Sequence, residues 1–172
     1  MNPRYDAELA LTLLAAVTAL VGLVTGRAQR LWTVATVALV GLALAIAWFA
    51  DDADGSRDRL LTVVAGVVAV AGGGLVTTQV FGIVDRASPV RRAGEVLRGG
   101  AWIGALERLA VYVALVAGWG PGLAIVLAVK GLGRYPELRS QEDTGAAERF
   151  IIGTFTSVLW AVACVGLAVL PS

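Results

Sequence analysis

Six apolar segments separated by short polar stretches account for most of this 172-residue chain. A membrane-spanning helix needs about 20 consecutive, mostly apolar residues. Most of the segments reach or approach that length, and the fifth along the chain is the shortest. They cover residues 8–26, 31–50, 60–84, 101–118, 121–135 and 150–170. The pattern predicts an all-α polytopic integral membrane protein with about six transmembrane helices, short loops and no soluble domain.

The amino-acid composition excludes several functional classes. Hydrophobic residues make up 58% of the chain and charged residues 16%, where a soluble protein carries about 25% charged residues. There is no histidine, and the single cysteine, Cys164, lies inside an apolar segment, which excludes His-ligated metals, thiolate metal sites and disulfides. The net charge of +1 gives no electrostatic footprint for nucleic acid. We therefore expect no metal, no cofactor and no catalytic residues.

The first apolar segment has two interpretations, a cleaved signal peptide and a retained helix. The residues before it mix Arg4 with Asp6 and Glu8, whereas a signal peptide begins with a basic region. Its apolar run is also longer than that of a typical signal peptide, and no small-residue cleavage motif follows. We therefore predict a retained transmembrane helix.

Basic residues predict the orientation, because loops rich in Lys and Arg stay in the cytoplasm. With six helices, three basic residues share the side of the N-terminus and ten fall on the opposite side. Those ten are Arg27, Arg30, Arg86, Arg91, Arg92, Arg98, Lys130, Arg134, Arg139 and Arg149. The difference predicts a bacterial inner-membrane protein with both termini outside, provided that the number of helices is even.

The loop after the second apolar segment carries four acidic residues. Its Asp51, Asp54 and Gly55 match the opening of the CDP-alcohol phosphotransferase signature, but the carboxylates that complete that signature are missing. The acids are also spaced as in a calcium-binding loop, but Ala50 and Leu61 occupy the first and last ligand positions, where carboxylates are needed. We therefore favour a solvated turn.

A basic stretch, residues 85–98, follows the third apolar segment. As an interfacial helix it places Arg91, Arg92 and Arg98 on one polar side, against anionic lipid headgroups. A plain basic loop that obeys the positive-inside rule explains the same residues, and both interpretations stay open.

The chain divides near residue 100, and only the second part carries charges deep inside its apolar segments. Residues 1–99 supply three helices and the basic loop, and residues 100–172 supply three more helices. Glu107 and Arg108 lie inside the fourth segment, about 9 Å from its end, and Lys130 lies inside the fifth. Such charges usually face the bundle and take a partner, because a charge at the bilayer centre costs about 2.5–3.5 kcal/mol. The Gly-rich turn between the two segments predicts that Glu107 and Lys130 meet.

Small residues accompany these charges. Gly104 lies one turn before Arg108, and Gly153, Ser157 and Ala161 form a stripe at every fourth position of the sixth segment. Small residues allow helices to approach closely in lipid. We therefore expect the last three helices to form a compact unit around the charges. The candidate binding residues are Glu107, Arg108, Lys130, Arg134, Thr154 and Ser157.

This cluster has two interpretations, which both stay open. In the first, it is an ion-paired network that holds three helices in register, with Lys130 and Arg134 extending to the headgroups. In the second, it is a site for an ion, a proton or an anionic solute, with Glu107 as the titratable group.

Three motifs of the second part resemble a known family. Residues 102–109 read WIGALERL, Lys130 and Arg134 follow, and residues 150–157 read FIIGTFTS. In order and spacing these resemble an uncharacterised bacterial inner-membrane family, a domain of unknown function with IGxLER, Lys/Arg and IIGTxxS motifs. The resemblance covers about residues 100–170. It supports the candidate site but implies no particular function, because the family has no assigned activity.

The sequence therefore predicts a small membrane channel or transporter for an ion or small solute, with Glu107, Arg108 and Lys130 along the path. The alternative is a non-catalytic accessory or scaffold protein that binds another membrane protein. A lipid-handling enzyme fits less well, because histidine and a complete carboxylate motif are missing. A monomer of 17.7 kDa has little room for a solvated pathway, which favours a homo-oligomer.

Overall fold

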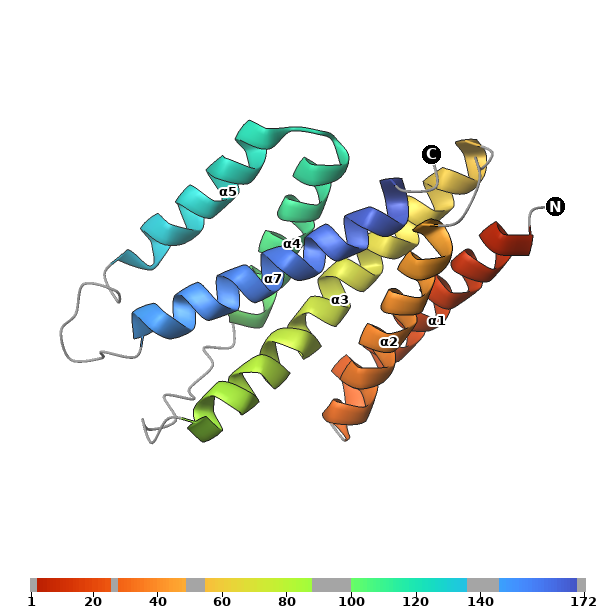
Figure 1. The fold of residues 1–172 in the computed structure, drawn as a ribbon. Helices are drawn as coiled ribbons and strands as arrows, with labels where there is room; N and C mark the ends of the chain where they lie inside the picture. The colour runs from red at the N-terminus through yellow and green to blue at the C-terminus, as the bar shows by residue number, and fades with distance from the viewer. Residues whose placement is uncertain (1–2, 26–27, 49–54, 88–99, 136–145, 170–172) are drawn as a thin grey trace.

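The computed structural model describes residues 3–25, 28–48, 55–87, 100–135 and 146–169. This part of the chain contains six α-helices and no strand, as the apolar pattern predicts. The helices, shown in Figure 1, are α1 (Pro3–Thr25), α2 (Gln29–Trp48), α3 (Gly55–Ala87), α4 (Gly100–Val116), α5 (Gly120–Gly133) and α7 (Ala146–Val169). The predicted acidic turn at Asp51 and Asp54, and the predicted headgroup contacts of Arg91, Arg92 and Arg98, lie outside the described residues.

Every helix occupies a predicted segment, but several ends differ. α1 begins at Pro3, five residues before the predicted start, because the first turn of a helix tolerates proline, whose missing N–H loses no bond there. Asp6, in the same turn, interacts favourably with the positive end of the helix dipole. α3 has 33 residues and extends past both predicted ends. Polar residues at a helix end therefore mark the edge of the apolar segment more closely than the edge of the helix.

Four of the described helices, α1, α2, α3 and α7, are long and apolar enough to cross a membrane. α4 has 17 residues and α5 has 14, so both are shorter than these four. The four long apolar helices indicate a helical membrane protein, and by length α4 and α5 do not add to the four candidate spans.

Small side chains lie inside the bundle and large apolar ones lie on its surface. Half of the buried hydrophobic residues of the described chain are alanines, and α1, α2, α3, α4 and α7 all contribute them. In contrast, Val24, Trp48, Trp102 and Leu132 are each more than 70% exposed. A water-soluble bundle buries such side chains, whereas helices in lipid pack through small residues and present large apolar ones to the acyl chains.

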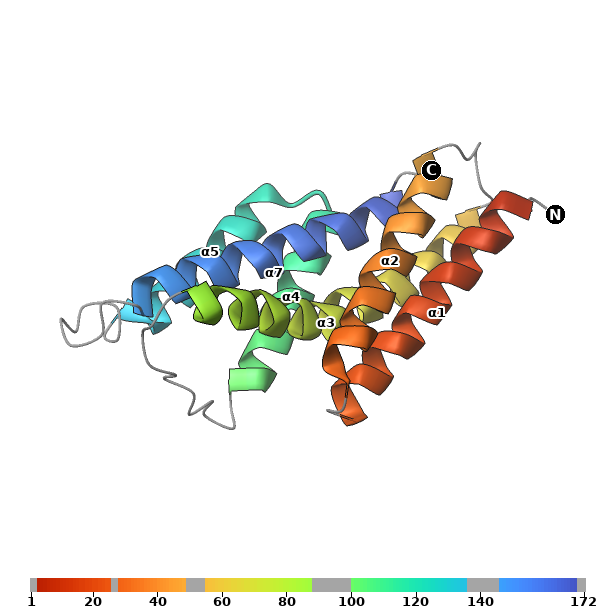
Figure 2. The same cartoon turned by 60° about the horizontal axis from the view of Figure 1, so that its bottom comes forward.

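α3 is the central helix. It packs against α1, α2, α4 and α7, and Figures 1 and 2 show it running antiparallel and next to α7. The α1–α2 hairpin covers one side of this pair and α4 the other. Among the described helices, α5 packs on α4 alone. The start of α1 and the end of α7 lie at the same end of the molecule (Figure 2).

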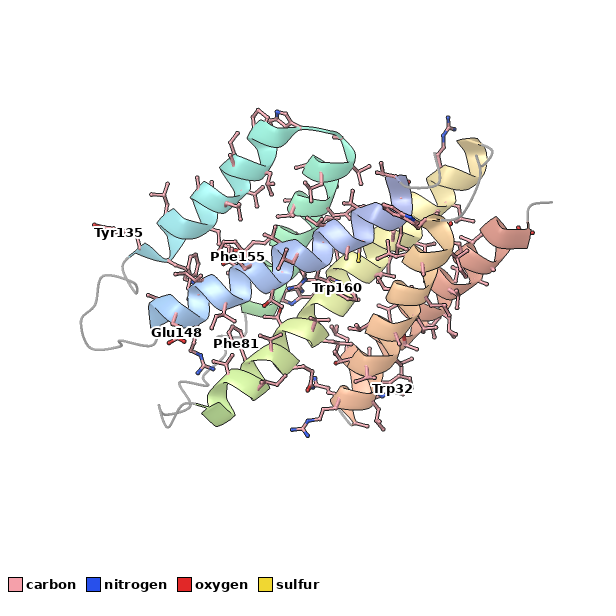
Figure 3. All side chains as sticks on the ribbon, in the orientation of Figure 1. Trp32, Phe81, Tyr135, Glu148, Phe155 and Trp160 are labelled. Atoms are coloured by element: carbon pink, nitrogen blue, oxygen red, sulfur yellow. The ribbon has the colours of Figure 1, made fainter. Side chains whose placement is uncertain are left out.

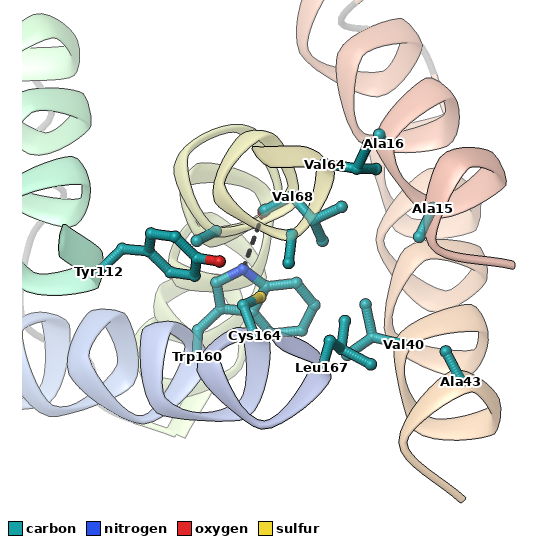
Figure 4. Packing of buried hydrophobic residues seen from close by; sticks show 12 residues of the cluster. Ala15, Ala16, Val40, Ala43, Val64, Val68, Tyr112, Trp160, Cys164 and Leu167 are labelled. Atoms are coloured by element: carbon teal, nitrogen blue, oxygen red, sulfur yellow. Dashed lines mark hydrogen bonds between the residues drawn. The ribbon is translucent and has the colours of Figure 1, made fainter. Parts of the chain in front are cut away.

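Three polar side chains from α4 and α7 donate hydrogen bonds to backbone carbonyls of α3. Tyr112 Oη donates to the carbonyl of Thr62 at 2.7 Å, Trp160 Nε1 to that of Val68 at 3.1 Å, and Arg108 Nε to that of Val70 at 2.8 Å. Figure 4 shows Trp160 pointing from α7 toward α3, with its hydrogen bond to Val68 dashed. A helical carbonyl has a second lone pair, so it accepts such a bond beside its intrahelical one.

A glycine lies four residues after each of these carbonyls, at positions 66, 72 and 74. In a helix, a side chain covers the turn before its own Cα, so a glycine there leaves the carbonyl of the preceding turn uncovered. The donor fills the space: a Cβ on Gly66 would lie 3.2 Å from the Tyr112 ring, and one on Gly72 would lie 2.8 Å from the Trp160 ring. The glycines of α3 thus determine where α4 and α7 attach.

Candidate functional site

Glu107 and Lys130 form an ion pair between α4 and α5. Lys130 Nζ donates to Glu107 Oε2 at 2.5 Å, and the two side chains are only 18% and 23% exposed, respectively. A tight turn brings them together: Gly118 adopts a left-handed φ of +63°, which suits glycine, and Pro121 lies in the first turn of α5. The pair predicted from the sequence is therefore present.

Arg108, the neighbour of Glu107, turns toward α3. Three glycines surround its guanidinium, Gly73 and Gly74 on α3 and Gly104 one turn earlier on α4. A Cβ on Gly104 would lie 3.1 Å from an Nη atom of Arg108, and a Cβ on Gly73 would overlap its side chain. With its Nε bound to the Val70 carbonyl, Arg108 ties α4 to α3 in addition to lining the site.

A small pocket lies beside the ion pair, between α4, α5 and α7. Its empty space is about 250 Å³, including the part that opens outward. The enclosed part is about as large as one water molecule requires. The lining residues are Glu107, Arg108, Val111, Val126, Leu127, Lys130, Thr154, Ser157 and Val158. The lining therefore combines four aliphatic side chains with charges from α4 and α5 and hydroxyls from α7.

The two hydroxyls of α7 differ in their partners. The Thr154 hydroxyl oxygen is buried and makes no hydrogen bond within the described part of the chain. Ser157 Oγ lies 3.3 Å from Thr77 Oγ1 of α3, and Thr77 also donates to the carbonyl of Gly73 at 2.7 Å. A hydroxyl can donate and accept at once, so these side chains extend the polar site from the pocket into the α3–α7 contact.

The stripe of small residues on α7 faces α3. A Cβ on Gly153 would lie 2.8 Å from the ring of Phe81, and the guanidinium of Arg149 lies 5.3 Å from the centre of the same ring. Ala161 is fully buried. The predicted stripe is therefore a packing surface, and Figure 3 shows Phe81 and Glu148 at the end of the bundle where α7 begins.

Five of the six predicted site residues line one pocket, and the sixth does not. Arg134 is exposed at the end of α5, where its backbone N–H donates to the carbonyl of Gly131 at 3.3 Å. The compact unit also differs from the one expected from α4, α5 and α7: α4 and α7 pack on α3, whereas α5 makes no packing contact with α7 among the described residues. The reason is the row of α3 glycines, which gives Arg108 and Trp160 a partner outside the last three helices.

The buried polar residues of α1 and α2 are not among the residues predicted from the sequence. Glu8 and Thr12 are fully buried, and Thr12 Oγ1 donates to the carbonyl of Glu8 at 2.8 Å. On α2, Thr33 and Thr36 are also buried. Glu8 stood at the expected start of the helix, where an acid is ordinary. The signal that was available is its spacing of four from Thr12, which puts both residues on the buried face of α1 with Ala15, Ala16 and Ala19.

Two further findings concern metal-binding clusters and comparisons with known proteins. Across the described ranges, no three His, Cys, Asp or Glu side chains gather as a metal site. Comparison with protein-family models, with curated proteins and with solved structures finds no match for this chain. The resemblance of residues 100–170 to an uncharacterised inner-membrane family therefore stays a prediction that rests on its three motifs.

Proposed function

We propose that this protein is a small membrane channel or transporter for an ion or a small solute, and that the Glu107–Lys130 pair is its binding site. The observation that carries the proposal is this ion pair beside a pocket with the unbonded hydroxyl of Thr154. Charged side chains inside a helical membrane bundle are costly, and where they occur they commonly mark ion or proton pathways.

The position of α5 favours a functional role for the pair over a purely structural one. Of the buried residues that form the main apolar cluster, none comes from α5, and Gly122 is its single buried residue. The pair therefore holds a peripheral helix, and not the core, so the bundle does not depend on it for its main packing. A pair of this kind can open without unfolding the protein, which is what a binding site requires.

We infer that all six helices cross a bacterial inner membrane and that both termini lie outside. The ten basic residues on one side favour this orientation. Tyr112 near the end of α4 bonds to Thr62 near the start of α3, so α4 extends along α3 toward the end where α3 begins. Exposed Trp102, Trp119 and Tyr135 at the ends of α4 and α5 suit the two membrane interfaces. A single chain has little room for a solvated path, so self-association accompanies this proposal.

The second candidate is a non-catalytic accessory protein that binds another membrane protein. The outer face of α5 supports it: Ile125, Val129 and Leu132 are exposed on a helix that packs on one neighbour only within the described chain. A lipid-handling enzyme remains the weaker alternative, because the incomplete carboxylate motif near Asp51 is its basis.

The test is ion flux from proteoliposomes that contain the purified protein, for several cations and anions. Glu107→Gln is compared with Glu148→Gln, which removes an exposed carboxylate in the first turn of α7, outside the pocket. We expect flux in the wild type and in Glu148→Gln and its loss in Glu107→Gln. A folded wild type without flux, which retains a partner during purification, supports the accessory role instead.

A further inference from the structure

The chemistry of the pocket limits what it can exchange with its surroundings. Glu107 is the one acid in its lining. Arg108 does not lose its proton in a protein, and its Nε is bound to the Val70 carbonyl. Lys130 is held by Glu107. The carboxylate of Glu107 is therefore the group in the pocket that can accept a proton, at the oxygen to which Lys130 does not donate.

The size of the pocket is the second limit. Its enclosed space holds about one water molecule, and four aliphatic side chains narrow it: Val111, Val126, Leu127 and Val158. A metal cation brings several oxygen ligands or waters with it, and an organic solute needs a cavity of about 300 Å³ or more. A proton needs only the water that carries it.

The hydroxyl groups in and beside the pocket can hold a water molecule near Glu107. The buried oxygen of Thr154 has no hydrogen-bond partner among the described residues, although a buried hydroxyl usually takes one. A water in the pocket can satisfy it and reach Glu107, which lines the same space. The hydroxyl oxygens of Ser157 and Thr77 lie 3.3 Å apart and extend the polar groups toward the contact between α3 and α7.

We infer that the species taken up by this pocket is a proton, which passes from a pocket water, bound to the Thr154 hydroxyl, to the carboxylate of Glu107. This inference rests on the proposed transport function and names its substrate. In the step, an O–H bond of a protonated water breaks and an O–H bond forms on Glu107, while Lys130 keeps its proton. The charge of the pair changes from zero to +1. Loss of the opposite charge loosens the hold of α4 on α5, and release of the proton restores it.

The surrounding charges are compatible with this cycle. Arg108 on α4 and Lys130 on α5 line the pocket together with Glu107, so two cationic side chains accompany its carboxylate. From α7, the pocket receives hydroxyls and an aliphatic side chain, and the charged residues of that helix, Glu148 and Arg149, lie in its first turn. α3 carries no charged residue between Arg59 and Asp85.

The experiment measures proton entry into proteoliposomes with a trapped pH-sensitive dye, driven by a potassium gradient with valinomycin. Potassium, sodium and chloride fluxes are measured in parallel at constant pH. We expect proton flux in the wild type, a fall of about 100-fold in Glu107→Gln, the low end for loss of a positioned proton-transfer group, and partial flux in Glu107→Asp. Thr154→Val, which keeps the shape of the side chain, should lower proton flux several-fold. Thr156→Val, two residues further along α7 and outside the pocket lining, should leave it unchanged.

Infrared difference spectra on changing pH provide a readout that is independent of flux. A protonated-carboxyl band that is present in the wild type and absent in Glu107→Gln supports the inference. Sodium, potassium or chloride flux that requires Glu107, without proton movement, overturns the inference and leaves the transport function in place. No flux of any species from a folded wild type overturns the transport function itself. Proton flux that Glu107→Gln retains in full also overturns the inference.

Discussion

The α1–α2 hairpin and the α3–α4–α7 group both pack through small residues, but they use polar side chains differently. In the hairpin, Thr12 and Thr36 donate to carbonyls four residues back in their own helices, and the Thr18–Thr36 hydroxyl contact of 3.1 Å joins the two helices. In the other group, the donors on Tyr112 and Trp160 reach across to the backbone of α3.

This difference in hydrogen bonding determines what fixes the arrangement of the helices in each region. A hydroxyl bonded within its own helix is satisfied before the helices meet, so the hairpin depends mainly on the shape of its small-residue surface. The donors of α4 and α7 find their partners only when those helices attach to α3 in one register. The α3–α4–α7 group is therefore the region whose arrangement is fixed by individual bonds, and two of its helices, α4 and α7, line the pocket together with α5.

The largest expected effect is at Trp160, which is 8% exposed and bonded to α3. Trp160→Ala removes a buried ring and its hydrogen bond and should lower the free energy of unfolding by about 3–5 kcal/mol. Trp102→Ala is the control, because Trp102 is 75% exposed and should change stability little. Thermal unfolding in detergent can be followed by thiol labelling of Cys164, the only cysteine, which is fully buried. Equal losses of unfolding free energy in the two variants would contradict the role of α3 as the helix to which α7 attaches.

A smaller effect is expected at the glycines of α3. In Gly72→Ala the new Cβ would lie 2.8 Å from the Trp160 ring, so we expect a loss of about 2 kcal/mol from overpacking. Gly41→Ala, on α2, has no neighbour within 4 Å and should gain about 0.5–1 kcal/mol, because alanine favours a helix. The same labelling assay measures both. A stabilising Gly72→Ala would mean that the α3 carbonyl is not the attachment point.

The next smaller effect on stability is expected at the Glu107–Lys130 ion pair. Lys130→Met leaves the Glu107 carboxylate without its cation and should cost about 1 kcal/mol, because the pair is partly exposed and its net contribution is modest. We expect this loss to disappear when Glu107→Gln is added. A double-mutant cycle on the free energy of unfolding measures the coupling, and a value near zero would mean that the two charges do not interact.

The smallest effect belongs to the hairpin. Thr36→Val removes the hydroxyl contact with Thr18 but keeps the shape of the side chain, so we expect a loss of about 0.6 kcal/mol, the average for such bonds between membrane helices. A loss as large as that of Gly72→Ala would show that both regions depend on individual polar bonds, and the comparison would fail.

Much of the fold follows from the sequence because apolar length and turn residues act locally. The six helices and the meeting of Glu107 with Lys130 are of this kind, since the turn at Gly118 joins their helices directly. The partner of Arg108 does not follow from local sequence. Val70 is 38 residues away, and nothing in the sequence near Arg108 indicates that its partner lies on α3.

A signal for that contact is present in the sequence in another form. The glycines at 66, 72 and 74 mark carbonyls of α3 that are uncovered, but a row of glycines does not say which donor will fill each place. The choice depends on the register of α4 and α7, which only the assembled bundle defines. The sequence also did not predict the burial of Glu8, because it shows only a helix start there, whereas in the assembled bundle α1 packs against α2 and α3.

We propose that the Glu107–Lys130 pair is a transport site and not only a link between helices. The most direct test is flux from proteoliposomes that carry Glu107→Gln and Lys130→Met together, a variant that removes both charges of the pair at once. We predict a protein with stability close to that of the wild type and without flux. A double variant that conducts as well as the wild type would contradict the claim and leave the pair as a structural contact.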